Sequence, residues 1–237
     1  MAADAAVRAH SGIIEMPTLI IVALLLLMTY ASSHGQSKED FERCLQAANT
    51  GNHDRAIDLC TRIINAGGIP RKDLASVLEL RGSALAEKKL YDRAMKDLNQ
   101  AIQADPAYAV SFNSRATIHV IMKNYDKAIA DYTQALRLDP SFKFIYALRG
   151  HAYVENKDYE RGIEDLNEAV RLDPKLTSAY LNRGYAFFGL SQYGKAIDDF
   201  NRAIKLDPNL AFAYNKRGKS FVNMGEIDQG IQDYSRA

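Results

Sequence analysis

The sequence has no tryptophan, only two cysteines and almost no net charge. Two cysteines in 237 residues are too few for a disulfide-built miniprotein or a four-ligand zinc site. The 30 Lys and Arg residues are balanced by 29 Asp and Glu, for a net charge of +1. Nucleic-acid binding needs a surplus of basic residues that face the phosphates, so no nucleic-acid partner is expected. A hydrophobic content of 47% is typical of a folded protein and excludes disorder as the main state.

The sequence also lacks an apolar run long enough to span a membrane comfortably. Its longest run, from Leu19 to Met28, would rise roughly 15 Å as a helix, about half the hydrocarbon thickness of a bilayer. Small residues follow the run, so residues 1–35 resemble a secretory signal peptide, within which Met16 is an alternative start. We therefore expect an exported protein, periplasmic or secreted. The alternative is an uncleaved amino-terminal segment that anchors the protein in the membrane.

The rest of the chain repeats with a period of 34 residues. Asp-Pro pairs begin at Asp105, Asp139, Asp173 and Asp207. With each proline at position 32, the units span 75–108, 109–142, 143–176, 177–210 and a truncated 211–237. Small residues recur at positions 8, 20 and 27, and large residues at positions 4 and 24. This pattern predicts helix-turn-helix units that bury their apolar faces only by stacking on neighbours.

Local signals support helices throughout these units. An Asp-Pro pair is expected to start a helix, because Asp can accept hydrogen bonds from free amides and Pro needs no partner at the first position. Tyr91-Asp92 and Tyr125-Asp126 are expected to mark the entry into the second helix of a unit. No stretch alternates with a period of two, so essentially no sheet is predicted.

These small, large and proline positions resemble the tetratricopeptide repeat over residues 75–237. The resemblance implies an all-α fold, a solenoid of stacked helix-turn-helix repeats in an open right-handed superhelical arc. Residues 37–74 resemble a divergent first hairpin, which ends at Gly67-Gly68-Ile69-Pro70 and is similar to the first repeat of exported bacterial members.

In that first hairpin Cys44 stands at position 8 and Cys60 at position 24. A terminal repeat has only one neighbour to bury it and gains from a covalent link. We therefore expect a Cys44–Cys60 disulfide, although the offset of the two positions argues that the α-carbons lie too far apart.

The recurring arginines and aspartates could serve either to bind a ligand or to hold the fold together. Arginine recurs at position 7 and aspartate at position 23 of every unit. The arginines form either an anion-binding ladder or structural pairs with the aspartates, and the equal numbers and periods favour the pairs. His119 stands at an apolar position and is expected in the core. The recurring arginines are Arg81, Arg115, Arg149, Arg183 and Arg217, and the recurring aspartates are Asp97, Asp131, Asp165, Asp199 and Asp233.

No catalytic arrangement stands out. The sequence has no Gly-rich phosphate loop, no histidines in metal-ligand spacing and no supported Ser-His-Asp or Cys-His set. We therefore expect a protein that is not an enzyme and that needs no cofactor or metal. An accessory subunit of an enzyme is a less favoured alternative.

The family resemblance places partner binding in the concave groove, at positions 2, 5, 9 and 12 of each unit. In the family's chaperone-tail binders, Lys, Arg and Asn at positions 5 and 9 clamp a terminal carboxylate. Here Asn113, Asn215 and Lys219 are isolated at these positions, so that clamp is not reproduced, and position 6 carries no asparagine ladder. Instead the groove is largely apolar and aromatic, with polar flanks, and exposed apolar patches mark binding surfaces. Since Lys219 is the only charged residue among the eight selected for partner binding, binding should survive raised salt. The predicted groove residues are Asn113, Phe144, His151, Tyr185, Phe188, Phe212, Asn215 and Lys219.

The expected function is therefore a scaffold in the bacterial cell envelope that binds proteins or peptides. The alternative is a membrane-anchored adaptor that faces the cytoplasm and uses the same groove. The chain ends at position 27 of the last unit, so Ile227, Ile231 and Tyr234 lack the repeat that would cover them. These uncovered apolar side chains predict that the protein self-associates through this edge. The alternative is that the chain is an incomplete gene product.

Overall fold

The computed structural model describes residues 35–237, with side chains from residue 39 onward. The predicted signal peptide, with its alternative start at Met16, therefore lies outside the described residues except for Gly35. None of the helices within residues 35–237 has both the length and the hydrophobicity needed to cross a bilayer.

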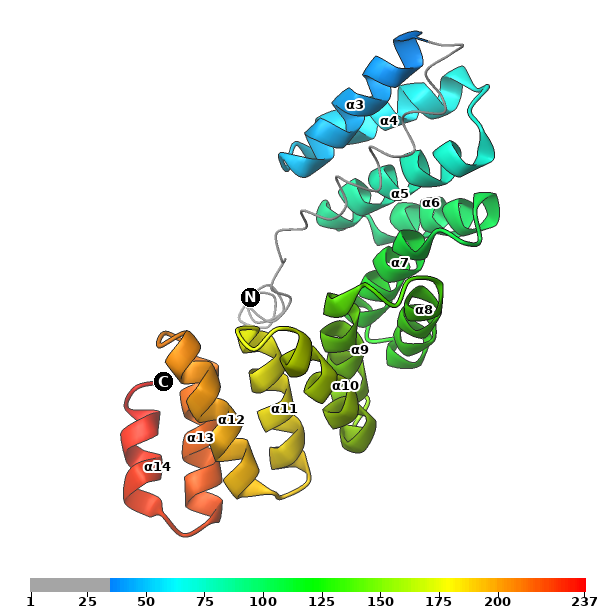
Figure 1. Cartoon of the computed structure of the whole chain (residues 1–237). Helices are drawn as coiled ribbons and strands as arrows, with labels where there is room; N and C mark the ends of the chain where they lie inside the picture. Colours follow the sequence, from blue (N-terminus) through cyan, green and yellow to red (C-terminus); the bar gives the residue numbers. More distant parts are fainter. Residues whose placement is uncertain (1–34) are drawn as a thin grey trace. The chain divides into compact units, whose positions relative to one another are not determined.

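Residues 35–237 form twelve α-helices and no strand. Figure 1 labels these helices along the chain. The predicted all-α fold of stacked hairpins is confirmed. The helices are α3 (Gly35–Asn49), α4 (His53–Ala66), α5 (Arg71–Glu87), α6 (Tyr91–Ala104), α7 (Ala109–Ile121), α8 (Tyr125–Leu138), α9 (Lys143–Glu155), α10 (Tyr159–Leu172), α11 (Thr177–Gly189), α12 (Tyr193–Leu206), α13 (Ala211–Asn223) and α14 (Ile227–Tyr234).

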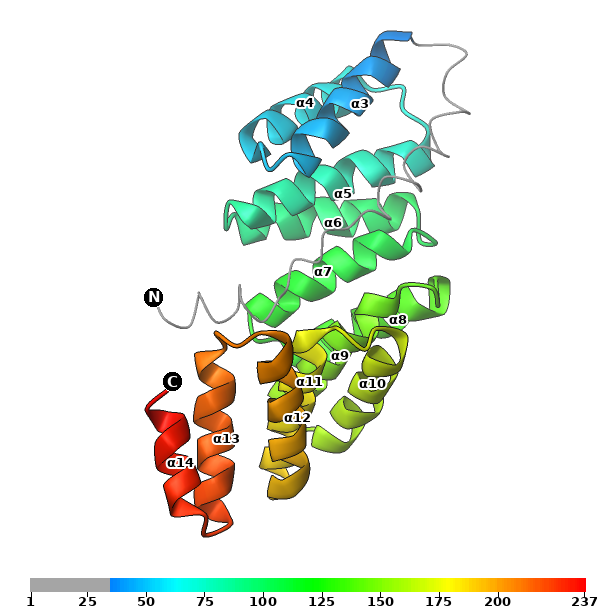
Figure 2. The ribbon, with the colours of Figure 1, turned by 60° about the vertical axis from the view of Figure 1, so that its left-hand side comes forward.

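The described helices belong to two compact units, residues 35–140 and 141–237. In the N-terminal unit, α3 packs on α4, α5 on α6 and α7 on α8, and the first helices α3, α5 and α7 contact one another in turn. The C-terminal unit repeats this arrangement with the hairpins α9–α10, α11–α12 and α13–α14, in which α11 contacts both α9 and α13. Figure 2 shows the same hairpins from a second direction. In each unit the first helices of successive hairpins thus form one continuous row.

The alternation of small and large residues sets how closely the helices of a hairpin approach. A Cβ atom added at Gly184 would lie 2.9 Å from the Phe200 ring, and one added at Gly150 would lie 2.8 Å from Leu166 Cγ. Position 8 of the first helix therefore faces position 24 of the second helix directly. A larger side chain at position 8 would push the helices apart.

The turn between the two helices of a hairpin uses a left-handed residue at position 15. The backbone φ is +61° at Lys89, +59° at Lys123, +63° at Lys157 and +58° at Ser191, and the fifth unit has Gly225 at +85°. The second helix then begins within two residues of this turn, at Tyr91 in α6 and Tyr125 in α8. The predicted role of the Tyr-Asp pairs is confirmed.

The Asp-Pro pairs do not start helices, and that prediction was wrong. Asp105 is the C-cap of α6 with an extended backbone, and α7 begins only at Ala109. The Asp105 carboxylate accepts a hydrogen bond from the Ala107 amide at 3.0 Å, and Asp173 and Asp207 make the same turn. The pair therefore ends one hairpin and turns the chain toward the next, because the residue before proline is biased away from helical geometry.

Residues 67–70 end the first hairpin, as predicted, but the next helix begins four residues before the predicted start of the first regular unit at residue 75. Helix α4 ends at Ala66, and Gly67 is its C-cap with φ +69°. Pro70 then precedes α5, which begins at Arg71 and is one turn longer than the first helices that follow it.

Candidate functional site

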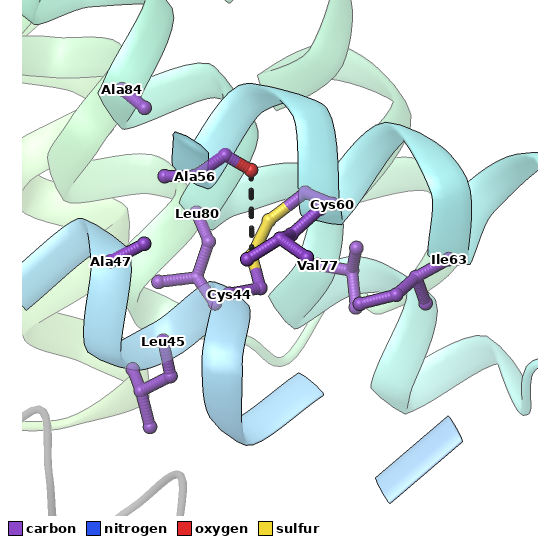
Figure 3. Close-up of a cluster of buried hydrophobic side chains, with 10 residues drawn as sticks. Cys44, Leu45, Ala47, Ala56, Cys60, Ile63, Val77, Leu80 and Ala84 are labelled. Carbon is purple, nitrogen blue, oxygen red and sulfur yellow. Dashed lines mark hydrogen bonds between the residues drawn. A yellow bond between two sulfur atoms is a disulfide. The ribbon is translucent and has the colours of Figure 1, made fainter. Parts of the chain in front are cut away.

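The cysteines join the two helices of the first hairpin. Cys44 on α3 and Cys60 on α4 form a disulfide with their α-carbons 5.7 Å apart, within the usual range for such bonds. Both are fully buried in a cluster with Leu45, Val77 and Leu80 (Figure 3). They occupy positions 8 and 24, where the other hairpins place a small residue against a large one. The objection that these positions are too far apart therefore does not hold.

The arginine and aspartate series forms the structural pairs that the sequence favoured. In each of the five repeats, the arginine guanidinium donates two hydrogen bonds to the aspartate carboxylate of the facing helix, at N–O distances of 2.5–2.8 Å. The aspartates are buried. Pairing with Asp199 raises the pKa of Arg183, while burial raises the pKa of Asp199 against the opposing effect of the arginine.

A further N–H of the guanidinium reaches the preceding hairpin. Arg183 donates to Asn167 Oδ1 at 2.8 Å and Arg217 to Asn201 Oδ1 at 2.6 Å. In the N-terminal unit Arg115 donates to Asn99 Oδ1 at 2.7 Å, and Arg81 donates to Thr61 Oγ1 at 3.1 Å. These arginines therefore hold neighbouring hairpins together, and their donors are engaged within the protein rather than presented to an anion.

His119 lies in the core, as predicted. It is buried, and its Nε2 atom is 4.0 Å from the Asp131 carboxylate. Burial lowers the pKa of its imidazole more than Asp131 raises it. Within residues 35–237 no cluster of three or more His, Cys, Asp or Glu residues is arranged to hold a metal ion.

The C-terminal unit carries an aromatic patch formed by Tyr185, Phe188 and Phe212. The first two lie on α11 and the third on α13, and all three are half-buried. The Tyr185 and Phe212 rings meet edge to face with centroids 6.1 Å apart, a favourable geometry for aromatic pairs. The sequence predicted these three residues in one groove, and the packing of α11 on α13 brings them together.

Lys216 lies against all three rings of the aromatic patch. Its Nζ atom is 4.6 Å from the ring centroid of Tyr185, 5.2 Å from that of Phe212 and 5.8 Å from that of Phe188. Such distances allow cation–π attraction. Burial lowers the pKa of Lys216, and the neighbouring Lys219 lowers it further. Lys219 Nζ lies 5.7 Å from the Phe188 ring, so the patch carries two ammonium groups rather than the one predicted.

The other predicted groove residues are distributed differently. Phe144, near the start of α9, stacks on Phe142 with ring centroids 5.6 Å apart. His151 is half-buried on α9, and Asn215 is exposed on α13 beside Lys216. Asn113 belongs to the N-terminal unit, where it lines a cavity between α3, α5 and α7.

This N-terminal cavity has a volume of about 290 Å³. Apolar side chains from the three first helices form much of its wall, among them Leu45, Leu80 and Val110. The polar residues that line it are Asn49, His53, Glu79, Ser83, Glu87, Asn113, Ser114 and Thr117.

Glu79 is the most unusual of these polar residues, because its carboxyl group is buried with only 3% of the residue exposed. The hydroxyls of Ser83 and Ser114 each donate to its Oε1 atom at 2.7 Å. Burial raises the pKa of Glu79, and the two hydroxyl groups offset only part of that effect. Within the described part of the chain no positive charge neutralises it.

Sequence reasoning missed Lys216 and Glu79 as site residues. Lys216 stands at position 6, which is not one of the groove positions implied by the family resemblance. Glu79 stands at position 5, a groove position, and is the only acidic residue among the predicted groove positions. Such a charge within an otherwise apolar groove is the signal that would have found it.

The C-terminal edge exposes apolar side chains, as predicted. We call Ile227, Ile231 and Tyr234 on α14 the terminal face. Their exposed fractions are 50%, 60% and 43%, which are high values for large apolar residues.

Models of the tetratricopeptide repeat family match more than half of the chain. Models described as "Tetratricopeptide repeat" match residues 75–108, 109–142 and 177–210, and one described as "TPR repeat" matches residues 150–191. No curated protein matches the chain.

Several solved structures resemble this one. MamA from Desulfovibrio magneticus RS-1 is 18% identical with a TM-score of 0.66, over 69% of this chain and 93% of its own. A tetratricopeptide repeat protein from Parabacteroides merdae is 18% identical with a TM-score of 0.69, over 83% and 77%. YrrB, described as a TPR protein with an unusual peptide-binding site, is 18% identical with a TM-score of 0.63, over 75% and 89%. At this level of identity the likeness shows a shared fold.

Proposed function

Because the chain belongs to the tetratricopeptide repeat family, we propose that it is a non-catalytic scaffold in the bacterial cell envelope that binds other proteins or peptide segments. The description of YrrB as a TPR protein with a peptide-binding site supports this class of partner. The observation that carries the proposal is the aromatic patch with its two lysines on the first helices of the C-terminal unit.

The chemistry of the patch defines the partner segment. Half-buried rings of Tyr185, Phe188 and Phe212 offer apolar contact area, and burying two or three large apolar side chains against them supplies several kcal/mol before ordering costs. Lys216 and Lys219 add positive charge beside the rings. The partner is therefore a segment with large apolar side chains and a neighbouring carboxylate. With two lysines at the patch, binding should weaken in part as salt screens their contribution.

A double substitution tests this site. Tyr185→Ala with Phe188→Ala should weaken binding of a partner captured from envelope extract at least tenfold, or about 1.4 kcal/mol, with unchanged helix content. The matched control is Phe187→Ala, because Phe187 is a half-buried phenylalanine on the same helix whose ring faces Lys195 of α12 at 5.4 Å. The control should bind like the wild type. A double variant that binds at wild-type strength places the site elsewhere.

The location in the envelope rests on the apolar run that ends at Met28 and on the disulfide of the first hairpin. Disulfides persist in oxidising compartments and are rare in the cytosol, so the disulfide favours an exported protein over an adaptor that faces the cytoplasm. Cell fractionation with amino-terminal sequencing tests this. A mature start near Ser32 or Gln36 supports export, and an intact start in the membrane fraction supports the adaptor.

A further inference from the structure

The N-terminal cavity contains two acceptor groups whose burial is unexplained by the fold. Glu79 is buried without a counter-ion, and Asn113, which is 8% exposed, has an Oδ1 atom buried without a hydrogen-bond partner. They hold the same position on the neighbouring helices α5 and α7, and both line the cavity. Burying such groups costs free energy when they remain unpaired. The cost is recovered if a ligand supplies a positively charged donor.

The cavity walls limit the shape of that ligand. Leu45, Leu80 and Val110 present apolar surface, and the cavity has a volume of about 290 Å³, near the lower end of the range for ligand pockets. A side chain with an apolar stem and a charged end matches such a site, because the stem packs on the apolar wall while the end reaches the acceptors.

The hydrogen bonds around Glu79 distinguish an ammonium from a guanidinium. A guanidinium binds a carboxylate best through both oxygens at once, but Oε1 already accepts from the Ser83 and Ser114 hydroxyls at 2.7 Å. An ammonium is a point charge with three donors that it can direct to separate acceptors. Glu79 and Asn113 are separate acceptors of this kind.

We propose that the N-terminal cavity is a second binding site, which takes the ammonium group of a lysine side chain from a partner peptide with the Glu79 carboxylate as its counter-ion. The proposal shares with the proposed function the premise of a polypeptide partner. The cavity lies in the N-terminal unit and takes a positive charge, whereas the aromatic patch lies in the C-terminal unit and takes a negative charge. A partner that engages both sites would carry its lysine and its carboxylate in separate segments.

Synthetic peptides test the proposal without a known partner. The probe is a short peptide of alanines and serines with one central lysine, blocked at both ends so that the lysine carries the only charge. The matched probe replaces lysine with norleucine, which keeps the apolar stem and removes the ammonium. Titrations of the full chain are followed by amide NMR. The lysine peptide should bind at least tenfold more tightly than the norleucine peptide and should shift the amides of Ser83, Asn113 and Ser114.

Two variants connect this preference to Glu79. Glu79→Gln should remove the preference for lysine, and Glu42→Gln should retain it, because Glu42 is an exposed glutamate of the same unit that does not line the cavity. Melting curves confirm that each variant is folded, and the comparison of the two peptides on the wild type stands without any variant.

Three outcomes overturn the proposal. The norleucine peptide binds as tightly as the lysine peptide, Glu79→Gln keeps the preference, or the shifted amides lie only within 141–237. None of these results bears on the loss of partner binding expected from the aromatic-patch variant, so the two proposals fail independently.

Discussion

Glu79 is a residue at which stability and binding oppose each other. Its pKa is raised above the ordinary value of 4.5 because the carboxyl group is buried, whereas in the unfolded chain it titrates near that value. Between the two pKa values the folded state binds more protons than the unfolded state. The free energy of unfolding therefore falls as the pH rises from about 4.5 through the folded-state pKa.

This linkage predicts that Glu79→Gln stabilises the protein at neutral pH. The gain should be about 1.4 kcal/mol for each unit by which the folded-state pKa is raised, and it should shrink as the pH falls toward about 4.5. Urea unfolding at several pH values measures it. Glu87→Gln is the control, with a small effect throughout. A Glu79→Gln variant that is less stable than the wild type at neutral pH contradicts the prediction.

Residue roles could be predicted from the sequence where a pattern recurs. Arginine at position 7 and aspartate at position 23 have the same period, and the structure pairs them in every unit. In contrast, a glutamate at position 5 and a lysine at position 6 each occur in only one repeat, at Glu79 and Lys216, so no recurring pattern reveals them. Their roles depend on side chains from neighbouring helices, Ser114 for Glu79 and Tyr185 for Lys216. Such contacts follow from packing, which the sequence of one unit does not encode.

At the scale of the elements, the left-handed turn at position 15 gives a matched pair of substitutions. Lys157 has a φ of +63° and Gly225 fills the equivalent turn at +85°. This region of φ disfavours residues with a side chain. Lys157→Gly should raise the free energy of unfolding by about 0.5–1 kcal/mol, and Gly225→Lys should lower it by a similar amount. Chemical unfolding of both variants tests the pair. If both substitutions raise the free energy of unfolding, or both lower it, the explanation is wrong.

The disulfide of the first hairpin predicts a loss of stability on reduction. The cysteines are separated by 16 residues, and closing a loop of this size stabilises by roughly 3 kcal/mol in the chain-entropy model. Reductant should lower the melting temperature of the wild type but not that of a variant with Cys44→Ala and Cys60→Ala. The intact mass of protein purified without reductant checks the bond, and two free thiols would exclude it.

The same hairpin tests the packing rule of the other units. Cys44→Gly with Cys60→Leu reproduces the pair at Gly82 and Leu98, where an added Cβ on Gly82 would lie 3.1 Å from Leu98 Cγ. This variant should be more stable than the double alanine variant, because leucine fills the space that glycine leaves.

The helices could be predicted from the sequence, but their starts could not all be. The 34-residue period fixes two helices in each unit, and Tyr91 and Tyr125 begin the second helices as expected. The Asp-Pro pair was misplaced because its two residues fit a helix start and a helix stop equally well. Asp105 is extended, with φ −137° and ψ 97°, so the chain leaves one helix there and needs three further residues to enter the next.

For the molecule as a whole, the terminal face predicts self-association. Ile227 and Ile231 are at least half exposed, and a second copy of the chain would cover them by the stacking that joins repeats within the array. Sedimentation velocity over a range of concentrations should show a dimer that Ile231→Lys disrupts. The control is Leu90→Lys, at a 39% exposed leucine in the N-terminal unit. A strictly monomeric wild type at high concentration would count against the prediction.

The arginine that joins two hairpins has a consequence for how the array can change length. Arg183 meets Asn167 of the hairpin before it, and Arg217 meets Asn201 in the same way. Removal of residues 177–210 as one block would bring Arg217 into the register of Arg183, opposite Asn167. Every donor would find an acceptor again, and no new junction would have to be invented. Gene duplication or protein engineering can therefore add or remove this repeat while the arginine–asparagine hydrogen bonds between neighbouring hairpins are kept.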